Sequence, residues 1–159
     1  MAWLAIPTLV PLAGLRSEAR GPHPVEANAV GTVVGWGDLE VDHLLAPPGT
    51  TLFARDIITT GAQSGAFVRL LAGDTVTVAQ SSEVALLARS SGGATSVLEL
   101  HSGGLLVRSF AGQSSGVRVP GASLSLKGHP AVCRVAVAGR SSAVVAESGG
   151  VIIQGADAP

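Results

Sequence analysis

Residues 75–89 read TVTVAQSSEVALLAR, and this stretch decides the fold class. Val76 and Val78 alternate with threonines, and Val84 and Leu86 repeat the same spacing after the intervening segment 79–82. A spacing of two residues places side chains on one face of a β-strand. The stretch therefore predicts two short strands, each with one buried face, joined by a turn.

The same signal recurs along the chain from residue 29 onward. Segments rich in Val and Leu, bounded by Gly, Ser, Pro or Asp, begin roughly every 8–12 residues. They are residues 29–35, 56–60, 66–71, 75–80, 83–89, 96–101, 105–109, 116–120, 123–127, 132–138, 143–147 and 151–154. Glycine-rich segments such as 91–93, 102–104, 112–116 and 148–150 are expected to form the turns between them. The prediction is an all-β fold of many short strands, and the spacing fits a β-sandwich and a β-solenoid equally well.

The apolar positions with this two-residue spacing form the predicted inner face. They are Val76, Val78, Val84, Leu86, Leu98, Leu100, Val117, Val119, Leu124, Leu126, Val135 and Val137. Only 3% of the residues are aromatic, so the core must be built mainly from Val, Leu, Ile and Ala.

Composition and charge exclude several classes of protein. The 159 residues suit one domain, and 10 Lys and Arg against 11 Asp and Glu give a net charge of −1. This balance, with the basic residues scattered, argues against a nucleic-acid binder. The single Cys133 allows neither an internal disulfide nor a cysteine-rich metal site.

The first residues carry a targeting signal. Residues 2–15 are an apolar run whose length suits the central part of a signal peptide, whereas a spanning helix needs about 20 apolar residues. Ser17 and Ala19 are small enough for a cleavage site after this run. Residues 1–19 are therefore expected to be a signal peptide or another apolar leader, 20–28 a linker, 29–155 the β domain and 156–159 a tail. This division predicts an extracytoplasmic protein, periplasmic or secreted, that has no membrane span once the leader is removed.

No motif predicts catalysis, a cofactor or a metal ion. The four histidines are far apart and lack the spacing of metal ligands. Residues 112–116 (GQSSG) match the nucleophile motif G-x-S-x-G, but a strand followed by Pro120 stands where that motif requires a helix. Cys133 lies in an apolar segment and is expected to be a small buried side chain.

The order of segments resembles the FecR domain family, an extracytoplasmic β module of bacterial cell-surface-signalling regulators and of stand-alone envelope proteins. The resemblance covers about residues 30–154. It rests on residues 31–35 (GTVVG), 48–60 (PGTTLFARDIITT), 63–71 (QSGAFVRLL), 72–78 (AGDTVTV), 98–107 (LELHSGGLLV), 119–122 (VPGA) and 147–153 (ESGGVII). Residues 127–135 (KGHPAVCRV) depart from the family's pattern because they lack its Thr and Phe. The resemblance implies a FecR-type β module and its location more strongly than a role in sigma-factor control.

These observations favour a non-catalytic domain that binds an unidentified protein, with a role in envelope signalling as one version. A structural envelope or surface protein that forms homo-oligomers through strand edges is the alternative, and a small-ligand site or enzyme in a barrel mouth is a third. The candidate interaction residues are Trp36 in a glycine-flanked turn, the pair Leu44 and Leu45, and the pair Gly103 and Gly104.

Overall fold

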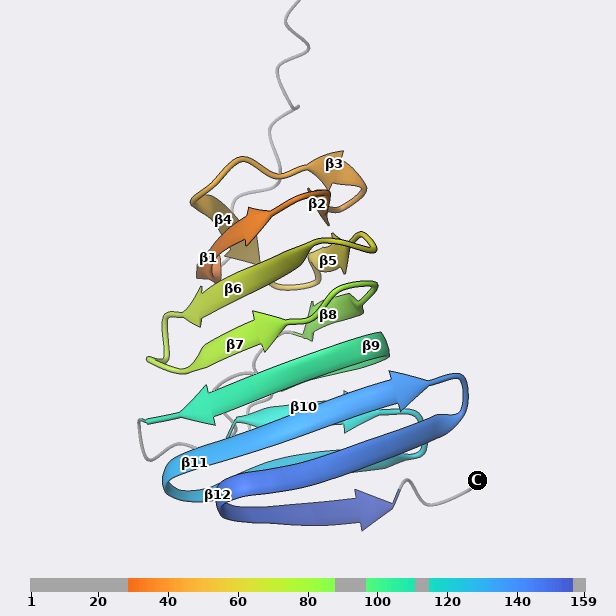
Figure 1. Ribbon diagram of the computed structural model, residues 1–159. Helices are drawn as coiled ribbons and strands as arrows, with labels where there is room; N and C mark the ends of the chain where they lie inside the picture. Colours follow the sequence, from red (N-terminus) through yellow and green to blue (C-terminus); the bar gives the residue numbers. More distant parts are fainter. Residues whose placement is uncertain (1–28, 88–96, 111–114, 156–159) are drawn as a thin grey trace, which may run out of the picture.

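The computed structural model describes residues 29–87, 97–110 and 115–155 (Figure 1). Within these ranges the chain forms twelve strands and no helix, which confirms the all-β prediction. None of these residues therefore belongs to a helix able to cross a membrane. The strands are β1 (Ala29–Trp36), β2 (Leu39–Val41), β3 (Leu44–Leu45), β4 (Thr50–Phe53), β5 (Ile57–Thr60), β6 (Gly65–Leu70), β7 (Thr75–Val78), β8 (Glu83–Leu87), β9 (Val97–Ser109), β10 (Gly116–Val119), β11 (Ala122–Ala138) and β12 (Ser141–Gly155).

The strands lie in two facing rows (Figure 1). The front row runs β4, β1, β6, β7, then the second half of β9, the second half of β11 and the first half of β12. The rear row runs β3, β2, β5, β8, then the first half of β9, β10, the first half of β11 and the second half of β12. Strands β9, β11 and β12 thus belong to both rows.

Glycines with a positive φ lie where these long strands cross between the rows. Gly103 in β9 has a φ of 84°, Gly128 in β11 has 102° and Gly149 in β12 has 73°. The sequence-based expectation of turns at 102–104 and 148–150, with separate strands on either side, is wrong. The same applies to the break expected between residues 127 and 132. Glycine bends the backbone at these points while ladder pairing continues on both sides of the bend.

The core lies between the rows and follows the predicted pattern. All the positions assigned to the inner face are buried, each with at most 7% of its surface exposed. Cys133 is also fully buried, as expected. The strands β2, β3 and β4 were not predicted, because β2 and β3 have only three and two residues and the sequence of β4, TTLF, does not alternate.

A buried carboxylate anchors the turn between β6 and β7. Asp74 follows Gly73, whose φ is 94°, and only 1% of Asp74 is exposed. Its carboxylate accepts a hydrogen bond of 3.2 Å from the backbone N–H of Phe110 and another from the Ser115 hydroxyl. Asp74 therefore ties the end of β9 to the segment that enters β10.

Candidate interaction surfaces

Three apolar side chains form an exposed patch on the outer face of the front row. Val34 lies directly opposite Phe67 in the β1–β6 ladder, and Trp36 lies opposite Gly65. The exposed fractions are 50% for Val34, 58% for Trp36 and 40% for Phe67. Because opposite residues share a face of the sheet, these side chains project together from the front row. We refer to Val34, Trp36 and Phe67 as the front-face patch.

The position of the Trp36 ring depends on Gly65. A Cβ atom at residue 65 would overlap several atoms of the indole ring, so the ring lies against the bare backbone of β6. The absence of a side chain at this position therefore allows a large aromatic group to rest on the sheet. Its contact with the backbone restricts its rotamers, which lowers the entropy lost when a partner binds.

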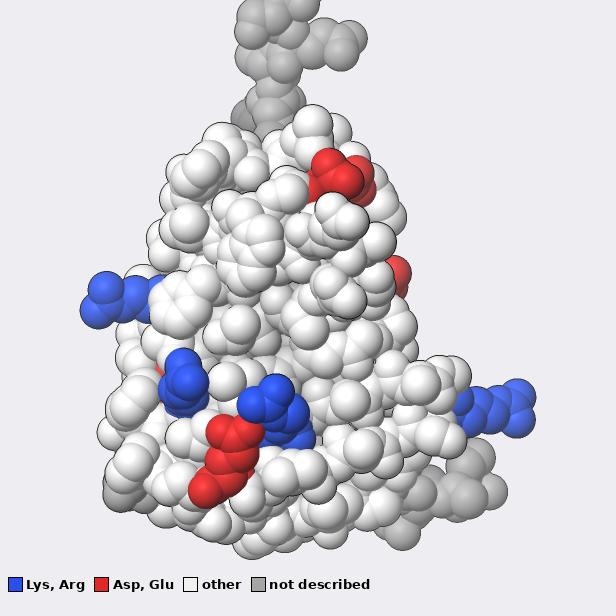
Figure 2. Space-filling model, in the orientation of Figure 1, with Lys and Arg blue, Asp and Glu red and all other residues white. Residues whose placement is uncertain are grey.

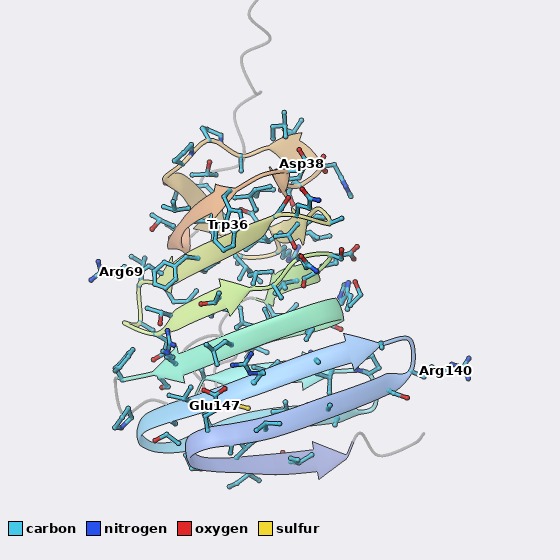
Figure 3. All side chains as sticks on the ribbon, viewed as in Figure 1. Trp36, Asp38, Arg69, Arg140 and Glu147 are labelled. Atoms are coloured by element: carbon cyan, nitrogen blue, oxygen red, sulfur yellow. The ribbon has the colours of Figure 1, made fainter. Side chains whose placement is uncertain are left out.

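The face around the patch carries little charge (Figure 2). Arg69 projects outward from β6 on one side of the patch, Asp38 lies on the other side, and Glu147 lies lower on the same face (Figure 3). Glu147 accepts hydrogen bonds from Arg134 Nη2 at 2.8 Å and Nε at 3.0 Å, through the same oxygen Oε1. This exposed ion pair offsets two charges of the lower front row.

The candidate residues identified from sequence lie at separate places. Trp36 ends β1 instead of occupying a turn, whereas Leu44 and Leu45 form β3, the outermost strand of the rear row. Leu44 and Leu45 are 61% and 75% exposed. Gly104 lies in β9, which β6 and β7 separate from β1. The structure therefore does not bring these candidates together in one site.

Gly103 and Gly104 pack against Ser82, in the turn between β7 and β8. A Cβ atom at Gly103 would overlap the side chain and Cα of Ser82. The N–H of Gly104 donates a 2.9 Å hydrogen bond to Ser82 Oγ, and Thr60 Oγ1 accepts a 3.0 Å bond from the N–H of Ser82. These contacts hold the bend of β9 against the neighbouring turn.

The free edge of β12 is a second exposed surface. β12 pairs with β11 along both rows and with no other described strand. Its 15 residues therefore end the front row and the rear row together (Figure 1). We call this unpaired side of the strand the β12 edge.

The core is incomplete at the β12 edge. Val144 and Ile153 lie opposite Val135 and Leu124 and so share the inner face with them. Val135 and Leu124 are 0% and 1% exposed, whereas Ile153 is 59% exposed and Val144 is only partly buried. Inner-face side chains that would be covered by another strand are thus open to solvent.

Sequence reasoning named Trp36 but not Val34 or Phe67, and it predicted pairing of strand edges without naming β12, although each surface left a signal. In β1 and β12, apolar residues occupy consecutive positions, as in Val33–Val34 and Ile152–Ile153, so that both faces of the strand are apolar. Such a strand is expected to be covered on both faces. Val34 is 50% exposed beside the buried Val33, and Ile152 and Ile153 are both exposed, so these residues mark surfaces that the described residues do not cover.

Two of the described titratable groups, Cys133 and His101, have distinct environments. Burial raises the pKa of the Cys133 thiol, and the nearby negative charge of Glu147 raises it further. A hydrogen bond of 2.9 Å joins Nδ1 of His101 and Oε1 of Glu83, and Nε2 of His101 lies 3.8 Å from Oε1 of Glu99. Its two ring nitrogens thus face different carboxylates. The part of the chain that the structure describes contains no group of three or more His, Cys, Asp or Glu suited to a metal ion. Residues 112–114 of the GQSSG segment lie outside the described residues.

Comparison with known proteins identifies no relative of this chain. No protein-family model, no curated protein and no solved structure matches it. The two surfaces described above are therefore the basis for assigning a function.

Proposed function

We propose that the chain is a non-catalytic, extracytoplasmic FecR-like domain that binds another protein through the front-face patch. The observation that carries this proposal is the exposed cluster of Val34, Trp36 and Phe67 on a sheet whose opposite face is fully buried. Tryptophan and other aromatic residues contribute much of the binding energy at protein interfaces. An aromatic cluster on a well-packed sheet needs little reorganisation when a partner docks.

The charge pattern supports a protein partner. The patch itself is uncharged, and Arg69 lies beside it (Figure 3). Arginine is common at the rim of protein interfaces, where it forms hydrogen bonds after the apolar centre is covered. An acidic or polar group of the partner facing Arg69 would complete such an arrangement.

The family and location parts of the proposal have separate support. The ordered FecR-like segments support a FecR-type module, as a sandwich or solenoid of short strands, and the apolar leader supports export. A role in envelope signalling is the version that this family resemblance favours. Fractionation of the producing cells with N-terminal sequencing of the mature chain tests the location.

Removal of the patch tests the proposed function. The full chain, Trp36→Ala and Phe67→Ala are used to capture partners from envelope extracts, with Ser123→Ala, an exposed residue of the rear row, as the control. We expect a partner that the wild type and Ser123→Ala retain, and that Trp36→Ala binds about 30-fold more weakly, corresponding to about 2 kcal/mol. Melting temperatures should be unchanged. Equal retention by all four proteins would contradict the proposal.

A structural role through strand edges is the second candidate function. The observation that favours it is the β12 edge, where both rows end in one unpaired strand with exposed inner-face side chains. A long unpaired edge is a template for pairing with another strand. This candidate and the front-face patch use different surfaces, so one chain can have both.

A further inference from the structure

We infer that the β12 edge pairs with the β12 edge of a second copy of this chain, in an antiparallel arrangement about a two-fold axis near Gly149. This inference rests on the second candidate function, edge-mediated assembly, and is independent of the front-face patch. It specifies the partner, the register and the residues that meet.

The β12 edge lacks the features that protect exposed strands. Proteins commonly place Lys, Pro or inward-pointing charges on free edges to prevent pairing. β12 contains no Lys, Arg or Pro, and its one charged residue is Glu147. Arg134 already neutralises Glu147 at 2.8 Å. Two β12 edges can therefore approach each other without bringing unpaired charges together.

The opposite end of the molecule does not match the β12 edge. Its front row ends in β4, four residues long, and the segment with Pro47 and Pro48 is tied down because Gly49 N–H donates to Val33 O at 2.9 Å. Its rear row ends in β3, two residues long, where Leu44 shares the inner face with Val41 and is 61% exposed. Two short strands flanked by prolines offer little backbone for pairing with a 15-residue edge. The surface that matches the β12 edge in length is another β12 edge.

The bend of β12 makes the strand complementary to itself. The strand runs along the front row, bends at Gly149 and returns along the rear row (Figure 1). A two-fold axis through the bend places the front half of one copy against the rear half of the other. The two halves then run antiparallel, and the inner faces of both copies join into one core.

The faces of the residues fix the register. The ladder with β11 shifts at Val132, which leaves one extra residue in β12 near Glu147. Because of this extra residue, the inner-face positions of β12 have even numbers before the bend, as in Val144, and odd numbers after it, as in Ile153. Antiparallel pairing about the bend at Gly149 then places Val144 opposite Ile153 of the second copy, on the inner face. On the outer face, Val145 lies opposite Ile152 of the second copy. A one-residue slip would place side chains of different faces against each other.

Both of these pairs are apolar. Val145 and Ile152 are 55% and 46% exposed in the single copy, and Ile153 is 59% exposed. Because of the two-fold symmetry, each pair occurs twice in the dimer. Pairing thus covers the large apolar side chains of β12 that the single copy leaves exposed.

Charge substitution at the outer-face pair tests both the dimer and its register. Val145→Glu with Ile152→Glu places like charges opposite each other twice, whereas Val145→Glu with Ile152→Lys places opposite charges there. A Glu at 145 also lies opposite Arg134 within the same copy, so folding should be preserved. The mass of the full chain is measured by light scattering over a range of concentrations, with Thr51→Glu on β4 as the control.

We expect the wild type and Thr51→Glu to be dimers. The Glu/Glu variant should dimerise about 100-fold more weakly, and the Glu/Lys variant should regain most of the dimer. Circular dichroism and melting curves establish that the monomeric variant is folded. A wild type that stays monomeric, pairs only with another protein, or forms larger open assemblies would overturn the inference. A Glu/Lys variant that stays as weak as Glu/Glu would overturn the register. Partner capture through Trp36 is unaffected by any of these results.

Discussion

Asp74 illustrates how one buried residue holds two distant segments together. Its carboxylate accepts bonds from the Phe110 N–H and the Ser115 hydroxyl, and Ser115 is 0% exposed. Replacement by Ala leaves the buried Ser115 hydroxyl and the part-buried Phe110 N–H without their acceptor, and a buried unpaired group costs about 1–3 kcal/mol. A sequence shows an Asp after a Gly only as a turn signal, since its distant partners depend on tertiary packing.

We therefore expect Asp74→Ala to lower the free energy of unfolding by about 2–4 kcal/mol. Ser115→Ala, which removes one donor and keeps the acceptor, should cost less. Urea denaturation of the full chain measures both changes. A cost for Asp74→Ala within about 0.5 kcal/mol of wild type would show that the two bonds do not stabilise the fold.

Cys133 should be unreactive while the chain is folded. Its side chain is fully buried, and burial together with Glu147 raises the pKa of its thiol. A thiol must lose its proton to react, so labelling by a disulfide reagent should be slow in buffer and fast in urea. Rapid labelling under native conditions would contradict the buried position.

The raised pKa of the Cys133 thiol also predicts a pH dependence of stability. Above the ordinary thiol pKa, the unfolded chain loses the proton while the folded chain keeps it. The unfolded state then binds fewer protons, so stability falls as the pH rises through this range. Cys133→Ala should show a smaller loss of stability than wild type between about pH 8 and about pH 10.

At the scale of elements, bends within strands replace several expected turns. Gly103 combines a φ of 84° with close contact to Ser82, so a side chain there is strained in two ways. We expect Gly103→Ala to destabilise the fold by about 2 kcal/mol or more. At the adjacent Gly104, the nearest atom to an added Cβ is 3.4 Å away, so Gly104→Ala is the matched control. Equal unfolding midpoints for the two variants would contradict the role assigned to the bend.

The sequence predicted the inner face of these elements better than their ends. A two-residue period is a local property, and every position assigned to it is buried. Whether Gly149 reverses the chain or bends it depends on the ladder that β11 offers on both sides, which lies outside the local sequence. The front-face patch was also only partly predictable, because it depends on how the strands pair. Trp36 was identifiable as a large aromatic residue, but its contact with Gly65 depends on the β1–β6 register.

For the whole molecule, the two ends of the stack differ. One end is formed by the short strands β3 and β4, whereas the other is formed by the 15-residue strand β12, which leaves Ile153 exposed. If two copies pair there, folding and association are linked. The melting temperature of the wild type should then rise with protein concentration, and that of Val145→Glu with Ile152→Glu should not. Scanning calorimetry over about a hundredfold range of concentration measures this difference, and a melting temperature independent of concentration in both proteins would contradict the linkage.

The sharing of β9, β11 and β12 between the two rows has a mechanical consequence. Each of these strands is hydrogen-bonded in the front row and again in the rear row, so no hinge line separates the rows. Hinge motion requires a few residues that can change conformation without breaking the packing around them. A force applied to one face is therefore transmitted through β9, β11 and β12 to the other face, and the two rows should move together.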